Sequence, residues 1–296
     1  MNKLYNKPEW LKIKIEHDPK FDDVRKTLSE NSLVTVCEEA HCPNINECWS
    51  SGTATFMVLG DTCTRGCRFC NVKSGRYGAN IDPMEPMKIA ESVKKWGLDY
   101  IVITSVDRDD LPDQGSEHFA KVITTVHQQS PEVLIEVLVP DFRGDVKCVE
   151  TVVQARPNVF AHNVETIERL QGRVRDNRAT YEQSLMVLEY AKKQGLYTKS
   201  SLMVGLGETE EEIAQTMDDL RRIDVDFLTL GQYLRPSLKH LEVVEYVHPD
   251  QFEHYKKIGL EKGFRYIAAG PFVRSSYKAG EFFIKSIVKE NGNDGA

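Results

Sequence analysis

The chain has 296 residues, of which 41% are hydrophobic and 28% are charged, and its formal net charge is −7. This length allows one large domain with extensions or two modest ones, and the composition is ordinary for a soluble globular protein. The negative charge gives no support to bulk nucleic-acid binding, and the apolar runs are too short to span a bilayer. We therefore expect neither nucleic acid nor a membrane as a partner.

The first fifteen residues, MNKLYNKPEWLKIKI, lack both the apolar core of a signal peptide and the Arg- and Ser-rich character of a transit peptide. They predict a cytoplasmic location. Because a reducing cytosol disfavours disulfides, the seven cysteines are better explained by metal binding. Cys148 stands alone in the sequence, and we expect it to be a partly buried small hydrophobic residue.

Residues 1–50 show little hydrophobic periodicity but contain a cysteine triplet, Cys37, Cys42 and Cys48, with the spacing C-x4-C-x5-C. A second triplet, Cys63, Cys67 and Cys70, has the spacing C-x3-C-x2-C and follows the first expected strand. Three thiolates are one short of the four that normally hold a cubane iron–sulfur cluster. Each triplet therefore predicts a cluster with one unusual ligand position.

Strand-like and helix-like segments alternate after residue 54. The expected strands are rich in β-branched and apolar residues: Thr55–Leu59, Tyr100–Thr104, Val133–Val139, Val159–Asn163, Thr198–Val204 and Phe227–Leu230. Amphipathic segments lie between them, near Met87–Trp96, Ser116–Gln129, Asp145–Gln154, Tyr181–Gln194 and Glu210–Ile223. This order predicts an α/β fold with a parallel sheet, either an open or partial barrel or a doubly wound sheet.

Helix boundaries support several of these elements. Gly97 and Gly195 each follow a basic last turn, which is typical of a glycine C-cap. Thr209 precedes three glutamates and is expected to be an N-cap. Beyond residue 240 we expect a helix near Asp250–Lys262, a short strand at Arg265–Ala269, the segment GPFVRSSY and a disordered tail.

Zinc is the alternative metal. A structural zinc site needs four ligands, typically from two well-separated pairs, so the lone second triplet fits it poorly. His41 beside Cys42 keeps a zinc site open for the first triplet.

The second triplet, CTRGCRFC, resembles the C-x3-C-x-aromatic-C signature of the radical S-adenosylmethionine superfamily, with Phe69 at the aromatic position. Both triplets, the RSSY segment, and stretches such as HNVETIERL and LMVGLGET together resemble the lipoyl synthase family over about residues 33–280. The resemblance implies a partial (β/α)6 TIM-type barrel over residues 53–240. An extension at 1–52 would carry the first triplet, and another at 241–296 the RSSY serine, both packed on the barrel.

The resemblance also implies two 4Fe–4S clusters and S-adenosylmethionine as cofactors. Cys63, Cys67 and Cys70 would leave one iron open for S-adenosylmethionine. Ser276, with Ser275 as the fallback, would complete an auxiliary cluster held by Cys37, Cys42 and Cys48, which donates sulfur. The expected contacts of S-adenosylmethionine are Phe69, Thr104, Ser105, Asn163, Glu165 and Arg175. A surface salt bridge is an equal alternative for Arg175.

The implied reaction is the insertion of two sulfur atoms at C6 and C8 of an octanoyl chain on a lysine of a lipoyl carrier protein. Such carriers are the lipoyl domains of 2-oxoacid dehydrogenases and the glycine cleavage H-type protein. Further implied partners are a low-potential electron donor, such as ferredoxin or flavodoxin, and an iron–sulfur carrier that rebuilds the auxiliary cluster.

Several alternatives stay open on the sequence. They are a biotin-synthase-like or methylthiotransferase-like enzyme, a ferredoxin-like electron carrier and a zinc-structured interaction protein. The charged stretch Asp107–Asp110 fits an ion-pair network as well as a substrate site. Gln114 stands where a second glycine is expected from the family.

Overall fold

The computed structural model describes residues 7–11, 25–26, 28, 30, 33–39, 42, 44–50 and 55–276. The tail that we expect to be disordered, residues 277–296, lies outside the described residues, as does His41. Within the described ranges, no helix is long and apolar enough to cross a membrane.

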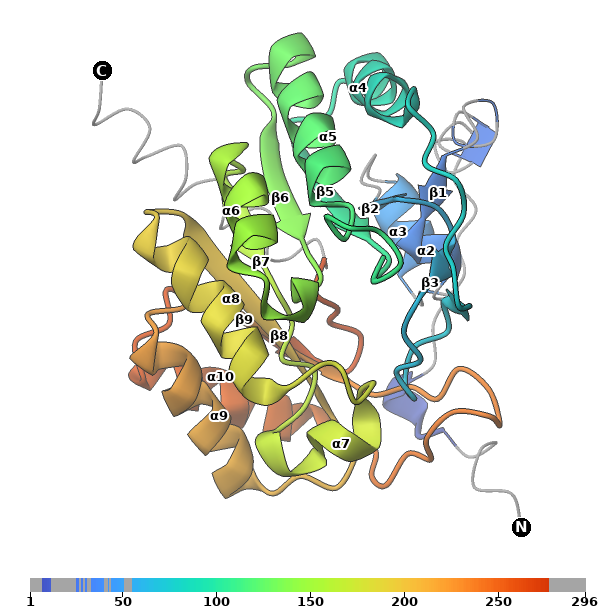
Figure 1. Ribbon diagram of the computed structural model, residues 1–296. Coiled ribbons are helices and arrows are strands. Elements are labelled where there is room, and N and C mark those ends of the chain that lie inside the picture. The colour runs from blue at the N-terminus through green and yellow to red at the C-terminus, as the bar shows by residue number, and fades with distance from the viewer. Residues whose placement is uncertain are drawn as a thin grey trace.

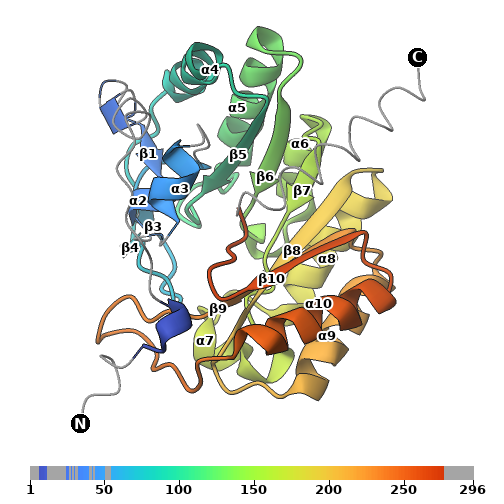
Figure 2. The same ribbon diagram turned by 180° about the vertical axis from the view of Figure 1, so that it is seen from behind.

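A single large sheet forms the centre of the described chain, with the strand order β1-β2-β5-β6-β7-β8-β9-β10 (Figures 1 and 2). All neighbouring strands are parallel except β1, which is antiparallel to β2. The six expected strands are confirmed as β2 and β5 to β9. The bounds are β1 Val34–Thr35, β2 Thr55–Val58, β5 Tyr100–Ser105, β6 Leu134–Leu138, β7 Val159–Ala161, β8 Tyr197–Val204, β9 Phe227–Gln232 and β10 Tyr266–Gly270.

Long helices connect successive parallel strands and cover the outer face of the curved sheet (Figure 1). They are α4 Glu85–Trp96, α5 Ser116–Gln129, α6 Val146–Gln154, α8 Tyr181–Lys193, α9 Glu210–Arg222 and α10 Pro249–Glu261. The sheet is open, because its order ends at β1 on one side and β10 on the other. An open, mostly parallel sheet with its helices outside is the expected partial barrel rather than a doubly wound sheet.

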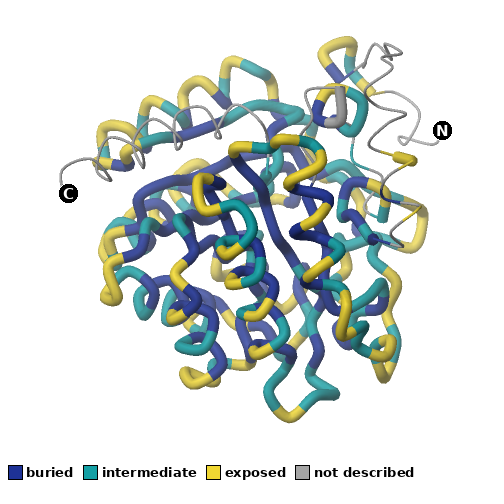
Figure 3. Tube along the Cα trace, turned by 90° about the horizontal axis from the view of Figure 1, so that it is seen from above, coloured by how far each residue is buried: buried dark blue, intermediate teal, exposed yellow. Residues whose placement is uncertain are grey.

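The two faces of each barrel strand serve different purposes. In β5, Ile101 and Ile103 pack into the main core against the helices, whereas Tyr100 and Val102 point to the inside of the barrel. Thr104, which shares the inner face, lines a cavity. Figure 3 shows the buried strands in the interior and exposed positions mainly on the outer helices and loops. The period of two along the strand therefore separates core residues from candidate functional residues.

The expected helix boundaries are confirmed. Gly97 caps α4 in the left-handed conformation, with φ of 59°. Gly195 follows Gln194, the C-cap residue of α8, and has φ of 81°. Thr209 forms a complete capping box with Glu212 at the start of α9. Each local signal thus ends or begins a helix where its chemistry requires.

Both ends of the described chain add to the central sheet. The N-terminal part contributes β1 and two short helices, α2 (Val36–Glu39) and α3 (Ile45–Ser50). The C-terminal part contributes β10, which pairs with β9 along its whole length. The segment that carries the first triplet and the segment that carries RSSY also meet directly, since the Asn44 side chain donates a hydrogen bond of 2.7 Å to the carbonyl of Phe272.

Candidate active site

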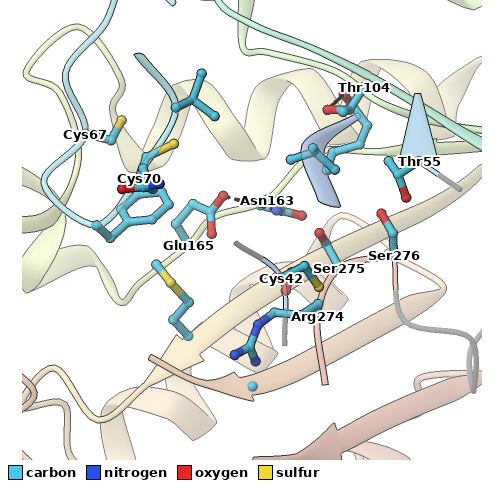
Figure 4. A pocket seen from close by; sticks show the side chains of 18 of the residues that line it. Cys42, Thr55, Cys67, Cys70, Thr104, Asn163, Glu165, Arg274, Ser275 and Ser276 are labelled. Carbon is cyan, nitrogen blue, oxygen red and sulfur yellow. Dashed lines mark hydrogen bonds between the residues drawn. The ribbon is translucent and has the colours of Figure 1, made fainter. Parts of the chain in front are cut away.

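A cavity of about 570 Å³ lies at the carboxyl ends of the barrel strands, the usual place for ligands in such folds. Every site residue expected from the sequence lines it: Cys37, Cys42, Cys48, Cys63, Cys67, Phe69, Cys70, Thr104, Ser105, Asn163, Glu165, Arg175 and Ser276. Figure 4 shows Cys67 and Cys70 at one end of this space and Cys42, Ser275 and Ser276 at the other, with Glu165 between them. The structure therefore brings both triplets and the serine into one chamber.

The second triplet follows β2: Cys63 ends the short strand β3 (Thr62–Cys63), and Cys67 and Cys70 lie on the tight loop between β3 and β4 (Lys73–Ser74). Backbone amides point at its sulfur atoms: Arg65 N lies 3.4 Å from Cys63 Sγ, and Asp176 N lies 3.3 Å from Cys67 Sγ. Such amides stabilise negative charge on sulfur. The loop is therefore built to hold thiolates.

Arg65 fixes this loop to the barrel. Its guanidinium donates two hydrogen bonds of 2.9 Å to Asp109, after β5, and one of 2.6 Å to Asp141, after β6. It also lies 3.3 Å from Asp107. The Arg65 side chain is 2% exposed, so these charged hydrogen bonds are formed out of water and hold the loop rigidly.

A second guanidinium extends the same network. Arg178 lies 3.1 Å from Asp109 and 2.8 Å from Asp176, and Asp176 in turn accepts the amide of Gly66. Arg108 pairs with Asp110 at 2.8 Å. The charged stretch Asp107–Asp110 is thus an ion-pair network, and Asp107 is the member of that stretch that also lines the cavity.

The first triplet spans the two short N-terminal helices. Cys37 lies in α2 and Cys48 in α3, and both are buried, while Cys42 between them is partly buried. Arg274, immediately before the two serines, lies near enough for its charge to lower the pKa of the Cys42 thiol, although burial raises that pKa more. The RSSY segment therefore reaches the first triplet, not the second.

Burial disfavours ionisation of the thiols of the second triplet. It raises the pKa of Cys63 and Cys67 to about 12 and that of Cys70 to about 11, and the Asp107 carboxylate adds to the rise in all three. Ligands of this kind release a proton when a metal binds. Burial also raises the pKa of Asp107 to about 6.

The donor set of each triplet suits an iron–sulfur cluster, because a cubane binds one thiolate at each of separate irons. Among the described residues, no three His, Cys, Asp or Glu side chains converge as ligands of a single metal ion. None of the six triplet cysteines, all of which lie in the described part of the chain, forms a disulfide.

Unpartnered polar atoms inside the chamber indicate that a ligand belongs there. Five buried atoms of its lining lack a hydrogen-bond partner within the described structure: Ser105 Oγ, Asp141 Oδ2, Asn163 Oδ1, Arg175 Nε and Ser276 Oγ. Buried polar groups are nearly always hydrogen-bonded, so a cluster of exceptions is expected where a polar ligand will satisfy them. These residues fit both a cluster ligand and S-adenosylmethionine.

Hydrogen bonds within the protein hold several of the side chains that we expect to contact S-adenosylmethionine. Asn163 donates a hydrogen bond of 3.1 Å to Glu165, whose backbone adopts a left-handed φ of 65°. Thr104 donates to the carbonyl of Leu138 at 2.9 Å. Burial raises the pKa of Glu165, and the nearby Arg175 guanidinium opposes the rise. Glu165 lies in the loop after β7, and a strained residue in such a position is a frequent feature of functional sites.

Arg175 is buried and does not form the surface salt bridge that was its alternative role. It donates a hydrogen bond of 2.7 Å to Ser184 and lies 3.8 Å from Asp141. Ser184 also lies 3.0 Å from Nε2 of His162. This chain of polar groups holds the guanidinium at the floor of the chamber.

Sequence reasoning missed several residues that shape the chamber: Asn44, Arg65, Asp141, His162 and Arg274. Their partners are distant in the sequence, so no local pattern marks them. Three of them nevertheless lie inside motifs that the sequence marks: Arg65 in the second triplet, His162 at the start of HNVETIERL and Arg274 at the start of RSSY.

Comparison with known families agrees with this architecture. Residues 57–220 match the model of the radical SAM superfamily. The chain is 56% identical to a chloroplastic lipoyl synthase of Populus trichocarpa, covering 98% of this chain and 75% of that protein. It is 57% identical to a chloroplastic lipoyl synthase of Arabidopsis thaliana and 55% identical to a mitochondrial one of Vitis vinifera, over 96% and 97% of this chain and 74% and 75% of those proteins.

Solved structures share the fold at low identity. Methylornithine synthase aligns with a TM-score of 0.56 and 14% identity, over 85% of this chain and 75% of that one. A maturase of the [FeFe]-hydrogenase aligns with a TM-score of 0.57 and 12% identity, over 83% and 65%. Both likenesses support the partial barrel.

The expected cytoplasmic location was wrong as judged by these relatives, whose names place them in chloroplasts or mitochondria. The expectation depended on the composition of the first fifteen residues. The composition of those residues therefore does not decide the compartment. The identity over nearly the whole chain, together with the superfamily match, shows that the chain belongs to the lipoyl synthase family of radical SAM enzymes.

Proposed function

We propose that the two triplets hold two separate 4Fe–4S clusters with different tasks, and that together they convert an octanoyl chain into a lipoyl group. Family membership makes the chain an enzyme that inserts sulfur, with S-adenosylmethionine and iron–sulfur cofactors, acting on lipoyl carrier proteins. The observation that carries the finer proposal is the shared chamber, which both triplets and Ser276 line.

Cys63, Cys67 and Cys70 are the proposed ligands of the cluster that binds S-adenosylmethionine. When bound, the cluster and S-adenosylmethionine supply a radical that can remove hydrogen from unactivated C–H bonds, for which no general base would suffice. The chain's part is orientation. Arg65 and its carboxylate partners hold the loop, and the amides of Arg65 and Asp176 stabilise the thiolates.

Thr104, Ser105, Asn163, Glu165 and Arg175 are the proposed polar contacts of S-adenosylmethionine, with Phe69 beside them. Their support is position and unmet hydrogen bonding, since Ser105, Asn163 and Arg175 each keep a buried unpartnered atom. The Glu165 carboxylate suits an amino or ribose hydroxyl group, and the Arg175 guanidinium suits a carboxylate.

Cys37, Cys42, Cys48 and Ser276 are the proposed ligands of the auxiliary cluster, which is the sulfur donor. Ser276 Oγ is buried in the chamber and has no hydrogen-bond partner among the described residues, as we expect of an oxygen atom that binds a cluster iron. A serine oxygen is a hard ligand and binds a cluster iron less firmly than a thiolate does, which suits a cluster that must give up its sulfur.

The remaining partners follow from these tasks. The first cluster needs an electron from a low-potential donor such as ferredoxin or flavodoxin. The auxiliary cluster is consumed by the reaction and needs an iron–sulfur carrier to rebuild it. The carrier substrate is a lipoyl domain of a 2-oxoacid dehydrogenase or an H-type protein of glycine cleavage.

An anaerobic assay tests the proposal. The reconstituted enzyme is incubated with dithionite, S-adenosylmethionine and an octanoyl-lysyl peptide, and the product is analysed by mass spectrometry. We expect a peptide that carries two added sulfur atoms. A product with one sulfur only, or with none despite cleavage of S-adenosylmethionine, contradicts the proposed function.

A further inference from the structure

Five basic residues gather where the chamber reaches the surface: Lys7, Arg68, Arg173, Arg235 and Lys239, together called the basic rim. Lys7 and Arg235 line the chamber itself. Arg68 donates a hydrogen bond of 3.4 Å to the carbonyl of Arg173, and its own carbonyl accepts the amide of Leu241 at 3.2 Å. The rim therefore joins three segments that are far apart in the sequence.

The charge of the basic rim is largely uncompensated. Within the described part of the chain, Lys7, Arg68, Arg173 and Lys239 have no carboxylate at ion-pair distance, and Arg235 has one partner, Glu242, at 3.7 Å. The guanidinium groups of Arg235 and Arg68 both lie near enough to Tyr233 to oppose the rise in its pKa that burial causes. A concentration of positive charge at this place contrasts with the net charge of −7 for the whole chain.

The segment that carries the rim is held firmly. In residues 233–241, Tyr233 Oη donates to the carbonyl of Leu241 at 2.9 Å, and Arg235 Nε donates to that of His240 at 2.9 Å. His240 Nε2 lies 2.9 Å from the carbonyl of Cys70, which ties the segment to the second triplet. Leu238 stands out from it with 68% of its surface exposed.

A short 3₁₀ helix, η2 (Glu9–Leu11), borders the same opening. Figures 1 and 2 both show it beside the segment that follows β9. Trp10 packs edge-on against His248, with ring centroids 4.9 Å apart, and Lys7, two residues before this helix, lines the chamber. The rim is thus preorganised for binding, which lowers the entropic cost of docking.

We propose that the basic rim is the docking surface for the octanoyl-bearing carrier domain, and that it binds an acidic face of that domain around the modified lysine. This inference rests on the proposed function. A lysine side chain with its octanoyl group is short, so the body of the carrier must lie at the opening while the acyl chain enters the chamber. Because the rest of the chain repels an acidic partner, local positive charge is needed to orient it.

Charge reversal tests the proposal with two substrates. The double variant Arg173→Glu/Lys239→Glu removes rim charges whose side chains are exposed and lie outside the chamber lining. Lys94→Glu, an equally exposed lysine on α4, is the matched control. Single-turnover rates are measured against the concentration of an octanoylated carrier domain and, separately, of a short uncharged octanoyl-lysyl peptide.

We expect the double variant to raise the half-saturating concentration of the carrier domain by about tenfold and to leave that of the peptide within about twofold. In the unaltered enzyme, salt should weaken carrier binding and not peptide binding. Lys94→Glu should change neither. Iron content and cleavage of S-adenosylmethionine check that the double variant is folded, and the milder Arg173→Gln/Lys239→Gln should give a smaller rise of the same sign.

Two results would overturn the docking surface: an unchanged half-saturating concentration for the carrier domain, or an equal change for carrier and peptide. These results differ from failure of the proposed function itself, in which case the unaltered enzyme would convert neither the carrier domain nor the peptide.

Discussion

Ser276 differs from its neighbour Ser275 in the state of its hydroxyl group. Both residues line the chamber, but within the described structure Ser276 Oγ is the one that is buried without a hydrogen-bond partner. A hydroxyl in that state costs about 1–3 kcal/mol unless a ligand compensates it. This difference favours Ser276 over Ser275 as the proposed fourth ligand of the auxiliary cluster.

We predict that Ser276→Ala lowers the iron content of the anaerobically reconstituted enzyme from about eight to about four per chain, with cleavage of S-adenosylmethionine retained. Ser275→Ala is the matched control and should keep about eight irons. Iron and sulfide analysis, with the visible spectrum, measures this. Equal losses in the two variants, or a loss in Ser275→Ala alone, would reject the assignment of Ser276.

Removing one thiol from each triplet in turn should affect different steps of the reaction. Cys63→Ala removes a ligand of the cluster that binds S-adenosylmethionine, so formation of 5′-deoxyadenosine should stop. Cys42→Ala leaves that cluster intact, so 5′-deoxyadenosine should still form while sulfur insertion stops. Chromatography of nucleoside products and mass spectrometry of the peptide give both readouts. If both variants lost only sulfur insertion, the tasks of the two clusters would be assigned wrongly.

Elements whose signal is local could be predicted from the sequence. The six barrel strands and five helices lie within a few residues of the expected ranges, because β-branched runs, helical periodicity and glycine or threonine caps act over short distances. β1, α2 and α3 were not predicted, because they are short and are stabilised by packing on the barrel rather than by their own periodicity.

Contacts between distant elements could not be predicted. Arg65 meets Asp109 and Asp141 across 44 and 76 residues, and Asn44 meets the carbonyl of Phe272 across 228. Cysteine spacing marked the cluster ligands because their chemistry restricts the residue type, whereas an arginine or asparagine has many uses. Gln114 adopts φ of 52°, which explains why a glycine is expected at that position.

His162 joins three elements and gives a testable pH dependence. Its Nδ1 lies 2.8 Å from the carbonyl of Val139, after β6, and its Nε2 lies 3.0 Å from Ser184 in α8. A carbonyl accepts only, so Nδ1 carries the proton of the neutral ring. Burial lowers the pKa of His162 to about 4, and the Arg175 guanidinium adds to this. The folded state therefore binds fewer protons than the unfolded state between about pH 4 and 6.5.

Stability from neutral His162 is present above the unfolded pKa and is lost as the pH falls. We predict that the free energy of unfolding declines by about 2 kcal/mol more in the unaltered protein than in His162→Gln between pH 7 and pH 5. Urea unfolding of both proteins at both pH values measures the difference. The other titrating groups are the same in the two proteins, so their contribution cancels in the comparison. If the free energy of unfolding declined equally in the two proteins, neutral His162 would not be a source of this pH dependence.

At the scale of the whole molecule, the two ends of the chain complete the chamber that the barrel begins. β1 and β10 extend the sheet at its opposite edges, and Asn44 joins the segment of the first triplet to that of Ser276. The carboxyl ends of the barrel strands supply the second triplet's surroundings. The two proposed cluster sites thus share one chamber because chain segments more than two hundred residues apart pack together.

A buried ion pair lies in the barrel interior, further from the carboxyl ends of the strands than the chamber. Glu136 on β6 accepts hydrogen bonds of 2.8 and 2.9 Å from Lys199 on β8 and one of 2.5 Å from the Tyr100 hydroxyl on β5. All three residues are buried. They belong to the inward-facing positions, two residues before Leu138 and Ser201, which line the chamber.

We predict that Lys199→Met destabilises the protein by about 3–5 kcal/mol, because it leaves the Glu136 carboxylate buried without its counter-charge. Glu136→Gln should destabilise it by a similar amount, since the ammonium of Lys199 is then the uncompensated group. The double variant Glu136→Met/Lys199→Met should be more stable than either single variant, because both charges are removed from the apolar interior. Urea unfolding of the four proteins measures this cycle. If the double variant lost as much stability as the two single variants together, Glu136 and Lys199 would not act as a pair, and the barrel interior would tolerate each charge alone.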